Sequence, residues 1–448
     1  MKTFFKIAGS ISGLGLILFF SLFTLVDRTP YQETAYYQQT IQKLNAIDDS
    51  FIISGDTISA GWSKINLTPH KKLPLAGYGK RGGKLFEDVH DSLWVRTVVF
   101  NNEETEIALV TADLLIIPNE VTIMLEESLQ EVGLSSNQIL LSATHTHTGI
   151  GGWAPGITGE FFAGDYDPQV VEFITQAIIN SIMEARKNQL PVKIGFARFQ
   201  LPELVANRLV GVQGKIDPWL RLILLEQING KVAAFTTFAA HPTCLSSSYL
   251  NLSRGYPGQL VDQIEALNKI DFALFAAGAV GSQKPGIKNK DDPWARINTM
   301  VGPMTEQIEL GLNFMLTQPQ YSLGLFKLPL GLRDPHFRIS EDLRLRPGLF
   351  RTFFGDYPSE ITVMRLGHIL LIGMPCDFSG ELVEPLQELA AQKELNLIIT
   401  SFNGGYIGYV TDDQWYDLDK YETRTMNWFG PYNGAYFSEL TARIIEMN

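Results

Sequence analysis

The sequence predicts an α/β fold in which mixed sheets are flanked by helices. Apolar runs of strand length alternate with longer amphipathic segments, which is the pattern of a layered α/β protein. The 448 residues are 45% hydrophobic and 19% charged, a globular composition with enough length for a large core. The sequence contains no long linker, repeat or low-complexity tract after residue 50. One continuous domain over residues 51–448 is therefore the simplest partition.

The expected elements can be placed in chain order. Apolar runs predict strands at residues 107–117, 138–143, 272–277, 361–365, 369–374 and 397–401. Residues 220–227 and 232–239 flank Asn229-Gly230, a strong hairpin signal. Amphipathic spacing predicts helices at residues 120–132, 173–187, 299–316, 380–392 and 438–447. The Arg-rich stretch 319–358 has no clear periodicity, and we interpret it as an irregular insertion.

The N-terminus has the pattern of a membrane anchor. Lys2 and Lys6 precede an apolar run at residues 7–26, and about 20 such residues suffice to cross a bilayer. The run lacks a small-residue cleavage site at its end, which favours an uncleaved signal anchor over residues 1–28 rather than a cleaved signal peptide. The preceding lysines predict that the rest of the chain lies outside the cytoplasm, on the envelope or extracellular side. Polar residues 29–50 are interpreted as a stalk between membrane and domain.

Charge and cysteine content exclude several classes of protein. The formal net charge is −12 and no Lys/Arg stripe is visible, so nucleic acid is not expected as a partner. Cys244 and Cys376 are too few for a disulfide framework. A disulfide between them, a role for Cys376 as a soft metal ligand, and two small buried residues all remain open, and the last is favoured. Nothing in the sequence indicates an oligomeric state.

Candidate metal ligands lie just past the ends of four predicted strands. They are His145 and His147 after residues 138–143, His241 after 232–239, Asp377 after 369–374 and Tyr409 after 397–401. Strand ends at one edge of a sheet are where α/β proteins build sites. In an extended segment, the two histidines of a His-x-His pair project the same way, and neutral imidazole nitrogens suit zinc. A hydrogen-bonded loop is the alternative explanation for this pair.

Motifs of other enzyme classes fail in context. Residues 77–82 fit the spacing of a dinucleotide-binding loop, but they neither close a predicted strand nor open an apolar helix. The sequence has no Gly-x-Ser-x-Gly elbow and no phosphate-binding Walker loop. These observations disfavour dehydrogenase, serine-hydrolase and nucleotide-binding functions.

The motifs together resemble the catalytic domain of the neutral (alkaline) ceramidases, which are zinc amidases that cleave the N-acyl bond of ceramide. The resemblance extends from about residue 60 to the C-terminus and implies an αββα-like layered fold, without the family's C-terminal sandwich domain. Its strongest block is residues 142–152, which resembles the family's Thr-His-Thr-His-Ser-Gly-Pro-Gly-Gly. The other matching segments are residues 60–69, 75–79, 90–96, 207–208, 240–243, 406–411, 421–422 and 429–431.

This resemblance implies a role for each site residue. His145 and His241 would be zinc ligands, with Asp377 and Tyr409 completing the site. His147 would face the substrate carbonyl, and Arg208 would lie beside it in the active site. Zinc would activate water for attack on an amide or ester carbonyl, while His147 and Arg208 would stabilise the developing oxyanion.

Two departures from the family pattern concern the same site. The family's Pro-Gly-Glu, whose carboxylate is a ligand, is Pro375-Cys376-Asp377 in this chain. The family's Gly-Asp-Val-Ser-Pro-Asn corresponds to residues 278–283, with Gly281 at the serine position and Ser282 one residue later as its candidate replacement. We therefore predict a zinc-dependent, ceramidase-like hydrolase acting on an N-acyl sphingolipid, a related lipid or another N-acyl small molecule. The alternatives are a non-catalytic metal- or lipid-binding envelope protein and a serine hydrolase that uses Ser282.

Overall fold

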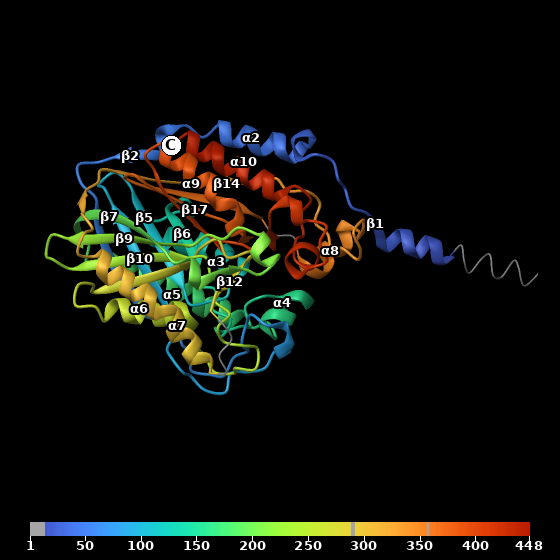
Figure 1. Ribbon diagram of the computed structural model, residues 1–448, viewed down its shortest axis with the longest axis horizontal. Coiled ribbons are helices and arrows are strands. Elements are labelled where there is room, and N and C mark those ends of the chain that lie inside the picture. Colours follow the sequence, from blue (N-terminus) through green and yellow to red (C-terminus); the bar gives the residue numbers. More distant parts are fainter. Residues whose placement is uncertain (1–13, 288–291, 356–357) are drawn as a thin grey trace, which may run out of the picture.

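The computed structural model describes residues 14–287, 292–355 and 358–448, and two large sheets dominate it (Figure 1). The first sheet has the order β11-β10-β9-β7-β3-β4-β5-β6, with β13 also paired to β7. Its strands are β3 (Ser59–Asn66), β4 (Trp94–Asn101), β5 (Glu106–Ala112), β6 (Ile139–Ala143), β7 (Leu190–Gln200), β9 (Trp219–Gln227), β10 (Val232–Phe238), β11 (Phe272–Ala277) and β13 (Gln318–Pro319).

The second sheet has the order β19-β17-β16-β14-β2. Its strands are β2 (Ile52–Ser54), β14 (Ser322–Pro329), β16 (Glu360–Leu366), β17 (Ile369–Gly373) and β19 (Asn396–Thr400). Smaller pairs join β8 (Val205–Asn207) to β12 (Gln283–Pro285), and β18 (Asp377–Phe378) to β20 (Tyr409–Val410). Both large sheets are mixed. The first has a parallel pair at each edge, β5–β6 and β10–β11, and the second has one, β17–β19, while their other neighbouring strands are antiparallel.

The two sheets pack face to face, and helices cover their outer faces. Buried side chains of the first sheet, such as Phe100 and Phe235, share one apolar cluster with Met364 and Leu371 of the second. Helices α3 (Asn119–Glu131) and α5 (Pro168–Arg186), and then α6 (Gly255–Glu265) and α7 (Pro293–Gly311), pack on the first sheet. Helices α9 (Val383–Gln392) and α10 (Asn433–Glu446) cover the second. The predicted α/β class with layered αββα-like architecture is confirmed.

Local sequence signals explain where several elements begin and turn. Asp167 and Asp292 cap α5 and α7 with their carboxylates, and in both helices a proline occupies the first turn, where no backbone N–H is needed. The predicted hairpin is β9–β10, in which Gly230 takes the positive φ of +86° that the turn requires. The stretch 319–358 is not irregular throughout, because it contains β14, β15 (Leu343–Leu345) and α8 (Pro347–Phe354).

The N-terminal region differs from the anchor expected from the sequence. Residues 14–22 are helical, but β1 (Phe23–Leu25) then pairs with β15, so the apolar run does not continue as one helix to residue 26. The start of the expected anchor, residues 1–13, lies outside the described residues. Over the described ranges, no helix has the length and apolar character needed to cross a membrane.

The segment expected to be a stalk is instead folded onto the domain. It contains α2 (Ala35–Asn45), which buries Tyr37, Thr40 and Leu44 along one face. The hydroxyls of Tyr31 and Tyr37 both donate to Glu439 of α10, at 2.7 and 2.6 Å. The polar composition of this segment concealed an apolar face of helical period, and that face is the physical reason why it packs rather than extends.

Candidate metal centre and substrate pocket

Histidines from two strand ends of the first sheet meet at one edge of the fold. His145 and His147 follow β6, and His241 follows β10. His145 has a φ of +58°, which is unusual for a residue with a Cβ and indicates that the surrounding structure holds it in place. The ring of Phe402, just after β19, stacks on the His145 imidazole at 3.8 Å with an interplanar angle of 8°. The convergence of strand ends predicted from the sequence is therefore present.

The three imidazoles form a compact triangle of nitrogens. Nε2 of His145 lies 2.9 Å from Nε2 of His241, and Nε2 of His147 lies 3.2 and 3.1 Å from these two atoms. Two ligands of a tetrahedral zinc are about 3.3 Å apart when each Zn–N bond is 2.0–2.1 Å. The observed separations are close to this value, so the three side chains fit a metal ion.

The protonation of this group also suits a metal. Nδ1 of His145 lies 2.6 Å from the Leu115 carbonyl oxygen, which requires Nδ1 to carry the proton and leaves the Nε2 lone pair available. Burial lowers the pKa of His145 to about 3 and lowers the pKa values of His147 and His241 well below the ordinary value. All three are neutral near pH 7, and neutral imidazoles with clustered nitrogens are suited to bind a metal ion.

His147 was expected to face the substrate carbonyl, and the structure places it with the other two histidines. Within the described residues, its ligand nitrogen and those of His145 and His241 all lie within 4.8 Å of one another. A Cβ at Gly77, whose φ is +111°, would lie only 2.9 Å from Nδ1 of His147. The glycine that superficially fits a dinucleotide-binding loop is needed instead to let the main chain approach this histidine.

Asp377 and Tyr409 lie side by side because β18 and β20 pair in parallel with these two residues in register. The Tyr406 hydroxyl donates to Oδ2 of Asp377 at 2.7 Å, while the buried Oδ1 has no hydrogen-bond donor among the described residues and lies 3.8 Å from Nδ1 of His241. Burial raises the pKa of Asp377 to about 7. The compact histidine group does not include this carboxylate. Coordination by Asp377 and Tyr409 stays a prediction.

Arg208 is held against Tyr409 in the buried wall of the site. Its guanidinium donates to the Tyr409 hydroxyl at 2.6 Å and pairs with Glu422 at 2.7 Å. Burial lowers the pKa of Arg208, but Tyr409, Glu422 and Asp377 outweigh this effect, and the net shift is upward. Arg208 is therefore a permanent cation that polarises the Tyr409 hydroxyl, close to the position expected from the sequence.

Ser282 is not among the residues that line the pocket. Its hydroxyl lies 2.6 Å from that of Ser379, and its carbonyl oxygen accepts a hydrogen bond from the Arg208 backbone N–H at 2.8 Å. A Cβ at Gly281 would come within 2.4 Å of the Asp377 carbonyl oxygen, so the chain leaves no room for a side chain at that position. The one-residue shift turns the serine away from the pocket, and Ser282 supports the Arg208 loop instead of facing substrate.

The two cysteines have separate environments. Both are free and buried, and they belong to different apolar clusters. Burial raises the pKa of the Cys244 thiol to about 12 and that of Cys376 well above its usual value. Neither joins the histidine group in the described part of the chain. They are two small buried residues, as favoured from the sequence.

A largely apolar pocket, partly open to solvent, leads down to His145 and His147. The sequence offered no signal for most of its walls, because the contributing residues come from separate loops and from α4 (Gly156–Ala163) and α8. The aromatic and apolar lining residues are Leu115, Ile116, Trp153, Phe162, Phe354, Tyr406, Tyr409, Tyr421, Met426 and Trp428. Glu120, Asn119 and Thr158 supply polar groups. The pocket fits a long apolar group better than a polar ligand.

A second set of residues supports the His145–His147 loop, a role that the sequence did not indicate. The hydroxyls of Thr146 and Thr148 both donate to the Ser253 carbonyl oxygen, at 2.7 and 2.8 Å. Asp91 holds this segment in turn, because it accepts from the Ser253 hydroxyl at 2.7 Å and from the Arg254 backbone and side chain, both at 2.9 Å. Asp91 thus positions the two histidines through two intermediate residues.

Fold and site together define an α/β protein with three clustered histidines that could hold a metal ion beside an apolar pocket. Residues 59–266 match the sequence model of the neutral/alkaline non-lysosomal ceramidases, N-terminal region. The resemblance that the motifs predicted is therefore confirmed, because this part of the chain is similar to the neutral/alkaline ceramidase family.

Individual relatives agree with this assignment. The chain is 23% identical to the neutral ceramidase of Pseudomonas aeruginosa over 266 residues, which cover 55% of this chain and 38% of that protein. It is 22% identical to the neutral ceramidase of Mycobacterium tuberculosis over 195 residues, 39% of this chain and 30% of the relative. The matched segments thus span well under half of these relatives.

Solved structures confirm the fold. The crystal structure of neutral ceramidase from Pseudomonas aeruginosa matches with a TM-score of 0.73 and 18% identity, covering 86% of this chain and 73% of the other. A structure described as ceramidase complexed with C2 matches with a TM-score of 0.75 and 18% identity, covering 86% and 74%.

Proposed function

We propose that this protein is a zinc-dependent amidohydrolase that cleaves the N-acyl bond of a ceramide-like lipid. The observation that carries the proposal is the group of three neutral histidines, two of which, His145 and His147, line an apolar pocket. Three protein ligands with further positions left open are typical of catalytic rather than structural zinc sites. The relatives named neutral ceramidase support the choice of an N-acyl lipid over other amides.

Zinc would be held by His145, His147 and His241, with Asp377 as a further candidate ligand, and would supply a water of lowered pKa and a Lewis acid. The chain's own groups then have distinct tasks. The Tyr409 hydroxyl, polarised by Arg208, would donate to the carbonyl oxygen as negative charge develops on it. Tyr406 orients Asp377 through its hydrogen bond to Oδ2, leaving Oδ1 for a cation or a proton.

The apolar lining would hold the acyl chain and exclude bulk water, which strengthens these electrostatic interactions. Glu120 and Asn119 add polar groups to the lining and are suited to the hydroxyl or amine groups of a head group. The burial of Ser282 and its bond to Ser379 argue against a serine hydrolase. From Lys2 and Lys6, we further propose that the domain acts outside the cytoplasm.

Metal analysis combined with a substrate screen tests the proposal. Purified wild-type protein should carry about one equivalent of zinc, and His145→Ala and His241→Ala should lose it. His368→Ala, which alters an exposed histidine, is the matched control and should keep both zinc and activity. N-acyl sphingoid bases should be hydrolysed faster than N-acyl amino acids or lactones, and a chelator should abolish turnover until zinc is restored.

Zinc content unchanged by the histidine substitutions would refute the metal site. Bound zinc with no hydrolysis of any substrate in the screen would favour a binding protein that retains the fold. The cellular side can be assigned separately by protease accessibility in intact cells.

A further inference from the structure

The rim of the pocket is built from two short helices, each of which has apolar side chains facing the pocket and others exposed to solvent. Helix α4 turns Thr158, Gly159 and Phe162 toward the pocket, and α8 contributes Phe354. The Thr158 hydroxyl donates to the Phe353 carbonyl oxygen at 2.9 Å, which joins the two helices. The residues on the inner faces of α4 and α8 thus serve to line the pocket.

The outer faces of the same helices expose large apolar side chains to solvent. Ile157 and Phe161 of α4 are 70% and 57% exposed, and Phe353 of α8 is 41% exposed. We call these three residues the outer rim. Ile157 and Phe161 are four residues apart and so lie on one face of α4. Apolar side chains clustered around a pocket mouth, unlike apolar residues scattered singly, mark an interaction surface.

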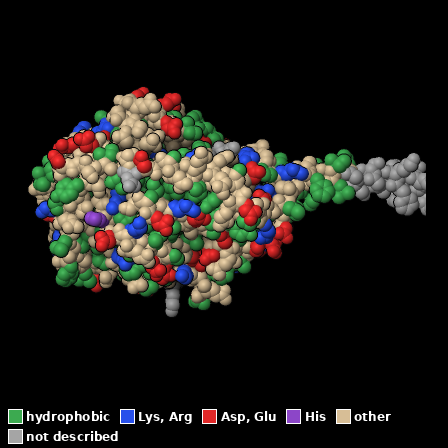
Figure 2. Space-filling view, turned by 90° about the horizontal axis from the view of Figure 1, so that it is seen from above, with side chains coloured by type: hydrophobic (Ala, Val, Ile, Leu, Met, Phe, Trp, Pro, Cys, Tyr) green, Lys and Arg blue, Asp and Glu red, His purple; other side chains and the backbone are tan. Residues whose placement is uncertain are grey.

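An apolar segment from the other end of the sequence leaves the domain beside this rim. Residues 14–22 contain no charged side chain, and Leu14, Ile17 and Phe20 are 60–69% exposed. The Arg346 backbone N–H and side chain donate to the carbonyl oxygens of Leu22 and Phe20, at 2.9 and 2.7 Å. Because α8 begins at the next residue, the segment is attached at the start of a rim helix (Figure 1). Figure 2 shows its apolar side chains projecting from the body of the molecule.

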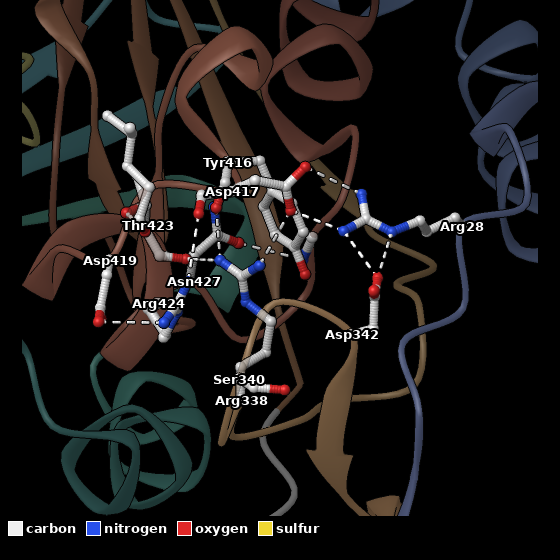
Figure 3. A network of polar contacts seen from close by, with 12 residues as sticks. Arg28, Arg338, Ser340, Asp342, Tyr416, Asp417, Asp419, Thr423, Arg424 and Asn427 are labelled. Atoms are coloured by element: carbon white, nitrogen blue, oxygen red, sulfur yellow. Dashed lines mark hydrogen bonds and ion pairs between the residues drawn. The ribbon is translucent and has the colours of Figure 1, made fainter.

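The direction in which this segment leaves is fixed by a network of ion pairs (Figure 3). Arg28 binds Asp417 with two hydrogen bonds of 3.1 and 2.7 Å and also pairs with Asp342 at 3.3 Å. Fully buried Arg338 stacks on Tyr416 at 3.7 Å and pairs with Asp417 from the other side at 3.4 Å. A bidentate arginine–carboxylate pair restricts geometry as well as adding energy.

The same network reaches the pocket wall. Arg338 donates to the Thr423 carbonyl oxygen at 2.6 Å, within the segment Tyr421–Thr425 whose first residue lines the pocket. On the other side of the exiting segment, Arg333 pairs with Asp27 at 2.7 Å and donates to the Thr29 carbonyl oxygen at 2.6 Å. The exit point, the rim helices and the pocket wall are thus joined by hydrogen bonds and ion pairs.

From this arrangement we infer that the outer rim and residues 14–22 form a single docking surface for a lipid bilayer, with the pocket mouth opening onto it. Three observations select a bilayer over a protein partner. The surface is continuous with an apolar pocket, it includes a segment with no charged side chain, and its exposed groups are large aliphatic and aromatic side chains suited to the acyl boundary. A substrate in the bilayer would enter the pocket without crossing bulk water.

The inference rests on the proposed function only for the identity of the substrate. Docking itself can be measured without any substrate, so failure of docking and failure of hydrolysis are distinguishable. The full chain carrying Ile157→Ser, Phe161→Ser and Phe353→Ser is compared with a matched variant carrying Val212→Ser, Ile228→Ser and Phe314→Ser. The control residues are exposed aliphatic and aromatic side chains outside the pocket and its rim, at 104%, 71% and 84%.

Binding is measured by flotation with phosphatidylcholine vesicles over a range of lipid concentrations. The outer-rim variant should partition on the order of tenfold to a hundredfold more weakly than wild type, while the control variant should stay within about twofold because its substitutions lie away from the surface. Equal melting temperatures of the two variants show that neither is unfolded. Hydrolysis of a water-soluble short-chain substrate should be unchanged in both.

Several outcomes would overturn the inference. Wild-type protein that does not float with vesicles, or an outer-rim variant that floats as well as the control, would remove the bilayer as the partner. A wild-type chain that is dimeric in lipid-free solution, and becomes monomeric only in the outer-rim variant, would show that the surface serves self-association instead.

Discussion

Replacing Asp91 by alanine should weaken both the fold and the metal site, although Asp91 touches neither a histidine nor the pocket. The carboxylate accepts three hydrogen bonds from the Ser253–Arg254 segment, at 2.7, 2.9 and 2.9 Å. That segment holds the hydroxyls of Thr146 and Thr148, which flank His147. The substitution therefore removes the support of the loop that carries two of the three histidines.

The magnitude can be worked from these contacts. Hydrogen bonds to a charged group contribute about 1.5–3 kcal/mol each. The sum is reduced because Asp91 is 23% exposed and because the buried Arg254 keeps its second partner, Asp262, at 2.6 Å. A loss of about 2–4 kcal/mol in the free energy of unfolding is expected. Displacement of the histidine loop should also lower zinc affinity about 10–100-fold, as is usual for residues that orient metal ligands.

Urea unfolding of the zinc-free protein measures the first effect, and competition with a zinc-binding dye measures the second. Asp91→Asn, which can still accept from Arg254, should cost less than half as much as Asp91→Ala. Asp88→Ala changes an exposed carboxylate in the same loop and is the control. If Asp91→Ala and Asp88→Ala behave alike in both measurements, the positioning role is refuted.

Three further predictions concern other parts of the site. Arg208→Lys should lower kcat about 100-fold with little change in KM, because in the proposed mechanism Arg208 acts through the Tyr409 hydroxyl only as charge develops on the carbonyl oxygen. An equal loss through KM would contradict this. Gly77→Ala should cost about 1–3 kcal/mol of unfolding free energy and reduce bound zinc, because its Cβ would press on His147. The control is Gly82→Ala, which has a φ of +56° and open space around the Cβ; it should cost about 1–2 kcal/mol and leave bound zinc unchanged. Burial raises the pKa of Asp113 to about 6 from an ordinary value of 3.8, so the folded protein keeps a proton that the unfolded chain has released. Stability should therefore fall by up to about 3 kcal/mol as the pH rises from about 4 to about 6, and Asp113→Asn should flatten that dependence in urea unfolding.

The strands and helices that the sequence predicted best are those with uninterrupted periodicity. The strands expected at 369–374 and 397–401 are β17 and β19, and the helix expected at 173–187 coincides with α5 up to Arg186. Strands β3, β4 and β7 were not predicted because polar residues interrupt their apolar runs. Their assignment depends on pairing with distant strands, which local patterns do not report.

Segments with polar composition were the least predictable. The Arg-rich stretch 319–358 was expected to be an irregular insertion, but Arg333, Arg338 and Arg344 are buried. Their guanidinium groups find backbone carbonyl oxygens of Thr29, Thr423 and Leu25, far away in the sequence. A buried charge is tolerable only when such acceptors are supplied, and no local pattern shows that they will be.

Within the site, the sequence by itself determined which residue types converge. His145 and His241 follow strands whose ends lie at one edge of the sheets, and the motif around residues 142–152 indicated the ceramidase family. Strand periodicity and motif order are local properties, and they carry this information without reference to the rest of the chain.

Tertiary structure decided how those residues face one another. It turned His147 toward the other two imidazoles, set Asp377 beside Tyr409 through the β18–β20 register, and turned Ser282 away from the pocket. It also brought the rim helices and the N-terminal segment together around the pocket mouth. These outcomes depend on side-chain direction and on contacts between residues hundreds of positions apart, which only the packed chain determines.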